Sequence, residues 1–103
     1  MQIPTELLPR AISLASIGCN ELAWAKADAL ELLETLQANH HVVLGGDVLQ
    51  EVDGKWQHNY DNWHFNPDPS HTHELNSVRS VSKARQYIQN YPVGPYLFVL
   101  VSA

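Results

Sequence analysis

The chain has 103 residues, of which 45% are hydrophobic and 17% charged, a composition that can bury a hydrophobic core. The length is too short for two domains that are each stable. We therefore expect one globular domain spanning residues 1–103. The formal net charge of −5 argues against a general nucleic-acid binder, whose surface carries a basic patch, and favours a basic partner.

The single cysteine, Cys19, excludes an intrachain disulfide and suits a cytoplasmic protein. Cysteine is small and often buried, so a packing role explains Cys19 better than a role as a nucleophile. The sequence places no base beside it that could activate the thiol. No apolar run reaches the roughly 18 residues that a membrane span needs. The opening MQIPTELLPR lacks the basic start and apolar core of a signal peptide. We expect a cytoplasmic protein that contacts no membrane.

The first predicted element is a short helix over Pro9–Ile17, with proline in its first turn and Gly18 as its stop. Residues 18–25 are expected to connect it to the next helix, with Trp24 in the core.

Lys26–Ala38 is the clearest amphipathic helix of the chain. Ala29, Leu33 and Leu36 follow the spacing of three and four residues that places side chains on one helix face. Asn39 suits the C-terminal cap.

The period changes to two over Val42–Val52, which indicates a strand. Asp53-Gly54 is a strong signal for a two-residue hairpin turn, because both residues tolerate a positive φ. Lys55–Tyr60 then returns as the second strand.

Residues 61–76 are expected to form a long connection, followed by a helix over Ser77–Tyr91 and a continuously apolar strand over Tyr96–Val101. In that helix Val78, Val81, Arg85 and Ile88 are expected along one side. The order predicts an α+β fold, in which a small, mainly antiparallel three-stranded sheet with a central hairpin packs against about three helices. The orientation of the last strand stays open.

A tight turn fixes which side chains share a face of the hairpin. It pairs Val52 with Lys55, Glu51 with Trp56, Leu49 with His58, and Asp47 with Tyr60. One face is then aliphatic and the other mixes aromatic rings with carboxylates. Because such mixtures are typical of interfaces, we expect the partner-binding residues to be Asp47, Glu51, Trp56, Tyr60 and Asp61. A bulge would shift the register and exchange the faces.

Other residues of this segment favour structural roles. Gly45 and Gly46 indicate a bulge or the close approach of another backbone. Asp61-Asn62 are turn formers whose side chains bond nearby amides, and Trp63 is expected in the core.

No nucleotide-binding, hydrolase or deaminase motif is present, so we assign no catalytic residue and no cofactor. Two alternatives stay open. One is a small metal-binding protein or enzyme that uses His64, His71 and His73 with Asp68, although these lie on a proline-bearing loop and we assign no metal ligand. The other is a homodimer joined through the apolar YLFVLV segment or the mixed sheet face.

Several short motifs together resemble a known family. They are AW at Ala23-Trp24, GGDV at Gly45–Val48, YDNW at Tyr60–Trp63, and the later Ser80, Ala84, Tyr87 and Ile88. In order and spacing they are similar to immunity protein family 40 of bacterial polymorphic toxin systems. His64 departs from the pattern, because a second aromatic residue is expected directly after Trp63.

The resemblance implies a small, cytoplasmic, non-enzymatic antidote that binds a cognate toxin domain made by the same cell or delivered by a sibling. Such a protein blocks the active site of the toxin or holds it inactive. A basic, nuclease-like toxin would suit the acidic chain, and the resemblance itself identifies no contact residues.

Overall fold

The computed structural model describes residues 3–15, 18 and 21–103. Within these ranges the chain forms two α-helices, one short 3-10 helix and five strands. In chain order the elements are η1 (Leu8–Arg10), β1 (Ile12–Ser13), β2 (Leu22–Ala23), α1 (Lys26–Ala38), β3 (Val43–Val52), β4 (Lys55–His64), α2 (His73–Asn90) and β5 (Tyr96–Ser102).

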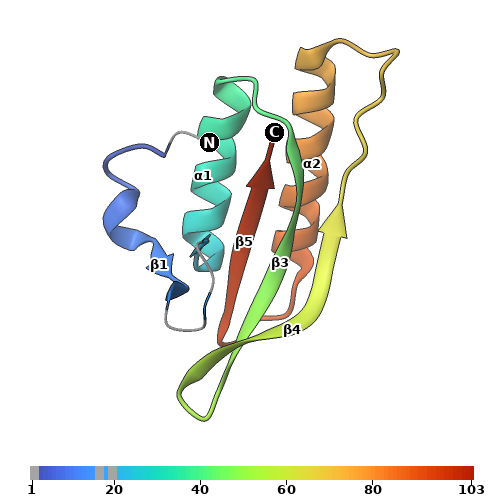
Figure 1. The fold of residues 1–103 in the computed structure, drawn as a ribbon. Helices are drawn as coiled ribbons and strands as arrows, with labels where there is room; N and C mark the ends of the chain where they lie inside the picture. The colour runs from blue at the N-terminus through green and yellow to red at the C-terminus, as the bar shows by residue number, and fades with distance from the viewer. Residues whose placement is uncertain (1–2, 16–17, 19–20) are drawn as a thin grey trace.

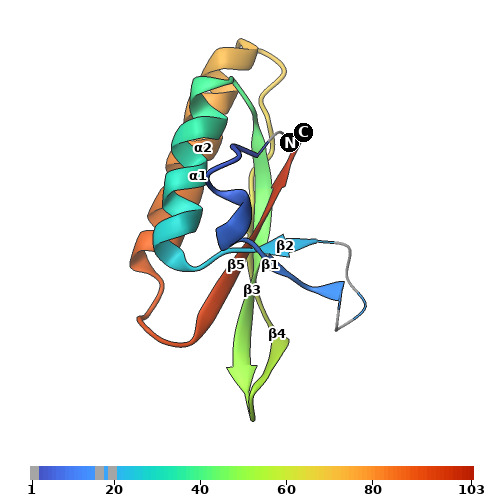
Figure 2. The ribbon, with the colours of Figure 1, turned by 90° about the vertical axis from the view of Figure 1, so that its left-hand side faces the viewer.

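The main sheet has three antiparallel strands in the order β4-β3-β5. Both α-helices pack on one face of this sheet (Figure 1), and the small β1–β2 hairpin lies on the other (Figure 2). The expected α+β class and antiparallel hairpin are confirmed. The expectation of about three helices and a single sheet is wrong, since the described residues form two α-helices and a second, two-stranded sheet.

The predicted helix over Pro9–Ile17 is the source of this error. The chain makes one 3-10 turn at Leu8–Arg10 and then becomes extended, with Ile12 paired to Ala23. Ile12 and Leu14, two residues apart, both pack on the same apolar cluster, as strand periodicity requires. The end of the predicted helix, residues 16 and 17, lies outside the described residues, as does Cys19.

Each face of the main sheet has its own apolar cluster. The helix-side cluster gathers α1 and α2 against Val43, Val48, Phe98 and Leu100, and Trp24 is buried in it as expected. The hairpin-side cluster is smaller. It consists of Leu14, Ala23, Leu49, Leu97 and Val99, with Ile12 and Trp56 packed against it. The apolar strand β5 is therefore covered on both faces within one chain.

Helix α1 has the predicted bounds and buries its predicted stripe of Ala29, Leu33 and Leu36. Helix α2 begins four residues earlier than predicted, at His73, because the Thr72 side chain accepts a hydrogen bond from the Leu75 amide and caps it. No helix within the described ranges has the length and apolarity to cross a bilayer.

The buried face of α2 is more polar than the sequence suggested. Val78, predicted on the same side of the helix as Val81 and Ile88, is 47% exposed, whereas Ser77 and Ser80 are buried with Val81 and Ile88. Their hydroxyls meet the start of β3. Ser77 donates to the His41 carbonyl at 2.6 Å, and Ser80 accepts from the Val43 amide at 2.9 Å. Because these bonds satisfy both hydroxyls, small polar residues pack here in place of valine.

The β3–β4 turn forms as predicted, with positive φ angles at Asp53 (52°) and Gly54 (77°). The register is also confirmed as far as the pair of Leu49 and His58. Beyond it the pairing of Asp47 with Tyr60 is wrong, because Asp47 pairs with Asn62.

A bulge in β4 causes this change of register. Residues 59–61 of β4 lie opposite Val48 alone, and Tyr60 adopts a φ of 70°. Strand β4 then resumes its pairing with β3 and continues to His64, four residues beyond the predicted end at Tyr60.

Gly45 and Gly46 lie in β3, the central strand of the main sheet. A Cβ on Gly46 would lie 2.1 Å from the Val99 carbonyl oxygen and 2.3 Å from the Trp63 ring. The β3–β5 register also shifts between Val43 and Gly45. The predicted bulge and close backbone approach are both present.

Candidate functional site

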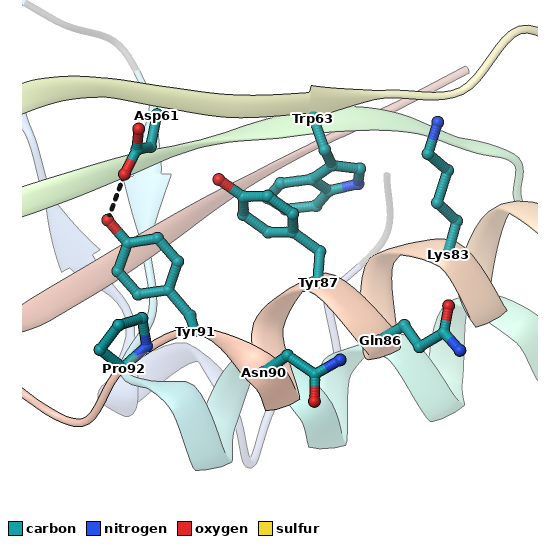
Figure 3. Close-up of a pocket in the computed structure, with 8 residues that line it drawn as sticks. All are labelled: Asp61, Trp63, Lys83, Gln86, Tyr87, Asn90, Tyr91 and Pro92. Carbon is teal, nitrogen blue, oxygen red and sulfur yellow. Dashed lines mark hydrogen bonds between the residues drawn. The ribbon is translucent and has the colours of Figure 1, made fainter.

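A broad hollow lies between the edge strand β4 and helix α2 (Figure 3). We call it the β4–α2 groove. Its volume is about 500 Å³, within the range of roughly 300–1,000 Å³ that small-ligand sites occupy. The lining residues are Asp61, Trp63, Lys83, Gln86, Tyr87, Asn90, Tyr91 and Pro92.

Aromatic rings form the floor of the groove. Trp63 is 6% exposed and stacks on Tyr87 with ring centroids 4.8 Å apart. Tyr87 in turn lies 5.9 Å from Tyr91, which meets Phe98 edge-on at 5.5 Å. The floor is thereby anchored in the helix-side cluster. The indole Nε1 of Trp63 is buried and has no hydrogen-bond partner in the described part of the chain.

A carboxylate and two hydroxyls occupy one end of the groove. Asn59 Nδ2 donates to the Tyr91 hydroxyl at 2.8 Å, and this hydroxyl donates to Asp61 Oδ2 at 2.7 Å. Burial, reinforced by the hydrogen bond to Asp61, raises the pKa of Tyr91 to about 12. Burial also raises the pKa of Tyr87, and the negative charge of Asp61 adds to the effect. Asp61 therefore acts on both tyrosines.

The other end of the groove carries a cation. Lys83 Nζ donates a hydrogen bond to the His64 carbonyl oxygen at the end of β4. Figure 3 shows the indole nitrogen of Trp63 on this side of the groove. Carboxylate and ammonium thus lie at opposite ends of an aromatic floor.

The bulge in β4 is what turns these side chains toward α2. Asn59 and Asp61 both reach Tyr91, whereas Tyr60 between them is 88% exposed at the edge of the sheet. Asparagine side chains hold the bulge. Asn59 Oδ1 accepts from the Asp61 amide at 2.9 Å, and Asn62 Nδ2 donates to the Tyr60 carbonyl at 3.0 Å. The run of Asn and Asp residues was the signal in the sequence for this backbone.

Residues 13–102 match the family model described as immunity protein 40, and this range includes every residue of the groove. The chain belongs to the immunity protein 40 family. The resemblance predicted from the short motifs is therefore confirmed. No curated protein and no solved structure matches the chain.

The fold of this immunity protein separates the residues predicted to bind a partner. Glu51 pairs with Trp56, which packs partly buried on the hairpin-side cluster, and Asp47 shares their face of β3. Asp61 lies on the opposite, helix-facing side, and Tyr60 stands at the edge between them. The prediction of one continuous mixed face is wrong, because it assumed unbroken alternation through β4.

The histidines considered as metal ligands do not come together in this immunity protein. His73 Nε2 lies 2.6 Å from the His40 carbonyl oxygen, and His71 approaches Asp68 at 3.6 Å. The hydrogen bond from the Ser70 hydroxyl lowers the pKa of Asp68 most, and the hydrogen bond from the Ser70 amide lowers it further. Among the residues that the structure describes, no three histidine, cysteine or acidic side chains are grouped to hold a metal ion.

Proposed function

We propose that this immunity protein neutralises a cognate toxin domain by binding to it and covering its active site, with no reaction of its own. The observation that carries the proposal is the family match over residues 13–102. The resemblance to antidotes of polymorphic toxin systems supports an encounter in the cytoplasm. The toxin domain would come from the same cell or from a neighbouring sibling.

The charge of the β3–β4 hairpin supports this proposal. Between Asp47 and Asp61 the chain carries four carboxylates and one ammonium group, that of Lys55. Such a surface complements a basic cleft of the kind that nucleases use, and it speeds the encounter with one. We therefore favour a toxin with a basic active site.

Tyr60 is the best candidate anchor for the contact. It is 88% exposed, stands at the outer edge of the sheet and borders the β4–α2 groove through its neighbour Asp61. Tyrosine is enriched in binding hot spots because it buries a large rigid ring and keeps a polar tip. Asp47, Glu51 and Trp56 stay predicted contacts on the opposite face.

The direct test is co-expression with the toxin domain encoded beside this protein. We expect protection of the host cell, a 1:1 complex on co-purification, and a toxin of unchanged mass by mass spectrometry. Protection by substoichiometric protein, with a covalently altered toxin, would show an enzyme and would overturn occlusion.

Substitution of the anchor tests the site separately. We expect Tyr60→Ala to weaken toxin binding by at least about tenfold in a calorimetric titration. The free energy of unfolding should change by less than about 0.5 kcal/mol, because the ring touches little. Val93→Ala is the matched control, since Val93 is 96% exposed on another loop. Equal affinity of the Tyr60 and Val93 variants would remove Tyr60 from the contact.

A further inference from the structure

The outer edge of β4 is poorly suited to pairing with another strand. Side chains already occupy several of its backbone groups. Asn62 bonds the Tyr60 carbonyl, Asn59 bonds the Asp61 amide, and Lys83 bonds the His64 carbonyl. The bulge between these residues also twists the edge, and both devices discourage strand addition. This edge therefore favours a partner that binds through side chains over one that adds a strand.

The polar end of the groove has unused capacity to accept hydrogen bonds. Asp61 Oδ2 accepts from Tyr91, and a carboxylate can accept about four hydrogen bonds through its two oxygens. The amide side chains of Gln86 and Asn90 are exposed along the helix side of the same groove. Acceptors thus lie on both the β4 side and the α2 side of the groove (Figure 3).

We propose that the β4–α2 groove binds an arginine side chain of the toxin. The guanidinium group donates to the Asp61 carboxylate beside the Tyr91 hydroxyl and stacks against the rings of Tyr87 and Tyr91. Its remaining N–H groups face the helix side of the groove, where Gln86 and Asn90 lie. The assignment relies on the proposed function only for the source of the arginine.

The chemistry of the groove selects arginine over other side chains. An anionic group would be repelled by Asp61, and the ammonium of Lys83 is already engaged by His64. A guanidinium group is planar, stacks on aromatic faces and carries five donors, which matches rings flanked by several acceptors. The ammonium group of lysine is compact and has three donors, so it would use the aromatic faces and the acceptors of the groove less fully.

The buried indole N–H of Trp63 is an independent indication that something docks here. A buried donor without a partner costs about 1–3 kcal/mol, so structures rarely leave one unused. It lies at the Lys83 end of the groove, beyond the rings of Tyr87.

The test is a titration of the purified protein, followed by amide NMR spectra, with N-acetyl-arginine amide as the probe. The neutral isostere N-acetyl-citrulline amide is the control ligand. We expect saturable shifts at residues 59–63 and 86–91, with half-saturation on the order of 10 mM. The citrulline compound should bind at least about fivefold more weakly. Equal responses to both ligands, or no saturable shift in the groove, would overturn the assignment.

Variants locate the interaction on Asp61. Asp61→Asn keeps the shape of the side chain and removes its charge. It should weaken binding of the arginine amide by at least about fivefold. Glu34→Gln removes the same charge from the exposed side of α1 and should bind like the wild type. If Asp61→Asn gives a dispersed, folded spectrum and unchanged affinity, the groove does not recognise a guanidinium group.

The two proposals fail in different ways. A wild-type protein that does not bind the toxin contradicts the proposed function, whatever the arginine amide does. Tight toxin binding combined with no response to the arginine amide contradicts the groove assignment alone.

Discussion

The Tyr91 hydroxyl ties β4 to the end of α2. It accepts a hydrogen bond from Asn59 and donates one to Asp61, so that one phenol joins both sides of the bulge to the helix. The ring itself packs edge-on against Tyr96 and Phe98, at 4.8 and 5.5 Å. The position of Asp61 in the groove therefore depends on a side chain that is anchored in the core.

This arrangement predicts a loss of stability at high pH. The folded protein holds the pKa of Tyr91 at about 12, above the ordinary value of 10.0, so folding favours the neutral phenol. Its contribution to stability is complete below pH 10 and is lost as the pH rises through about 12. Denaturant unfolding at steps across this window should show a steeper loss for the wild type than for Tyr91→Phe. Identical pH profiles of the two proteins would contradict this linkage.

Gly46 is required for steric reasons. A methyl group there would lie 2.1 Å from the Val99 carbonyl oxygen, and a backbone atom at the centre of the sheet cannot retreat cheaply. We expect Gly46→Ala to lower the free energy of unfolding by about 1–3 kcal/mol or more, measured by chemical denaturation. Gly54→Asn is the control, because that turn position is open and asparagine tolerates its φ of 77°. A loss no larger than that of the control would show that the sheet adapts.

Among the helices and strands, the sequence predicted correctly those features that neighbouring residues determine. The spacing of Ala29, Leu33 and Leu36 fixed α1, and Asp53-Gly54 fixed the turn and the nearest strand pairs. The bulge at Tyr60 depends on Asn59 and Asn62 bonding the backbone, which no periodicity reveals.

The same contrast explains why part of the site was missed. The N-terminal hairpin forms because Ile12 and Leu14 pack on an apolar cluster made by distant strands, although the spacing of Ile12 and Ala15 also fits a helix. Asp61 was named from the sequence as a contact, and the structure moves it to the other face. The groove residues on α2 were not assigned to a site, because nothing local shows that Tyr87 and Tyr91 will lie opposite β4.

The β1–β2 hairpin should contribute measurably to stability. Leu14 is 1% exposed and closes the hairpin-side cluster, whereas Leu8 on the 3-10 turn is 47% exposed. We expect Leu14→Ala to cost about 2–5 kcal/mol of unfolding free energy, and Leu8→Ala less than about 1 kcal/mol. Equal costs in denaturant titrations would mean that the hairpin is not packed on the sheet.

For the whole molecule, the net charge of −5 predicts how a basic toxin would meet it. Long-range attraction accelerates association and is screened by salt, over a Debye length of about 10 Å at 0.1 M. We expect the association rate measured by stopped flow to fall by about tenfold between low salt and 0.5 M salt, with a smaller change in the dissociation rate. A rate that does not depend on salt would argue against a basic partner.

The central claim is that the toxin covers the β4 edge and the groove behind it. Hydrogen–deuterium exchange of the protein with and without its toxin tests this most directly, since it reports the covered segments without any substitution. The account predicts slower exchange in residues 55–64 and 83–92 and little change in α1. Protection confined to α1 or to the N-terminal hairpin, with β4 and α2 unaffected, would contradict it.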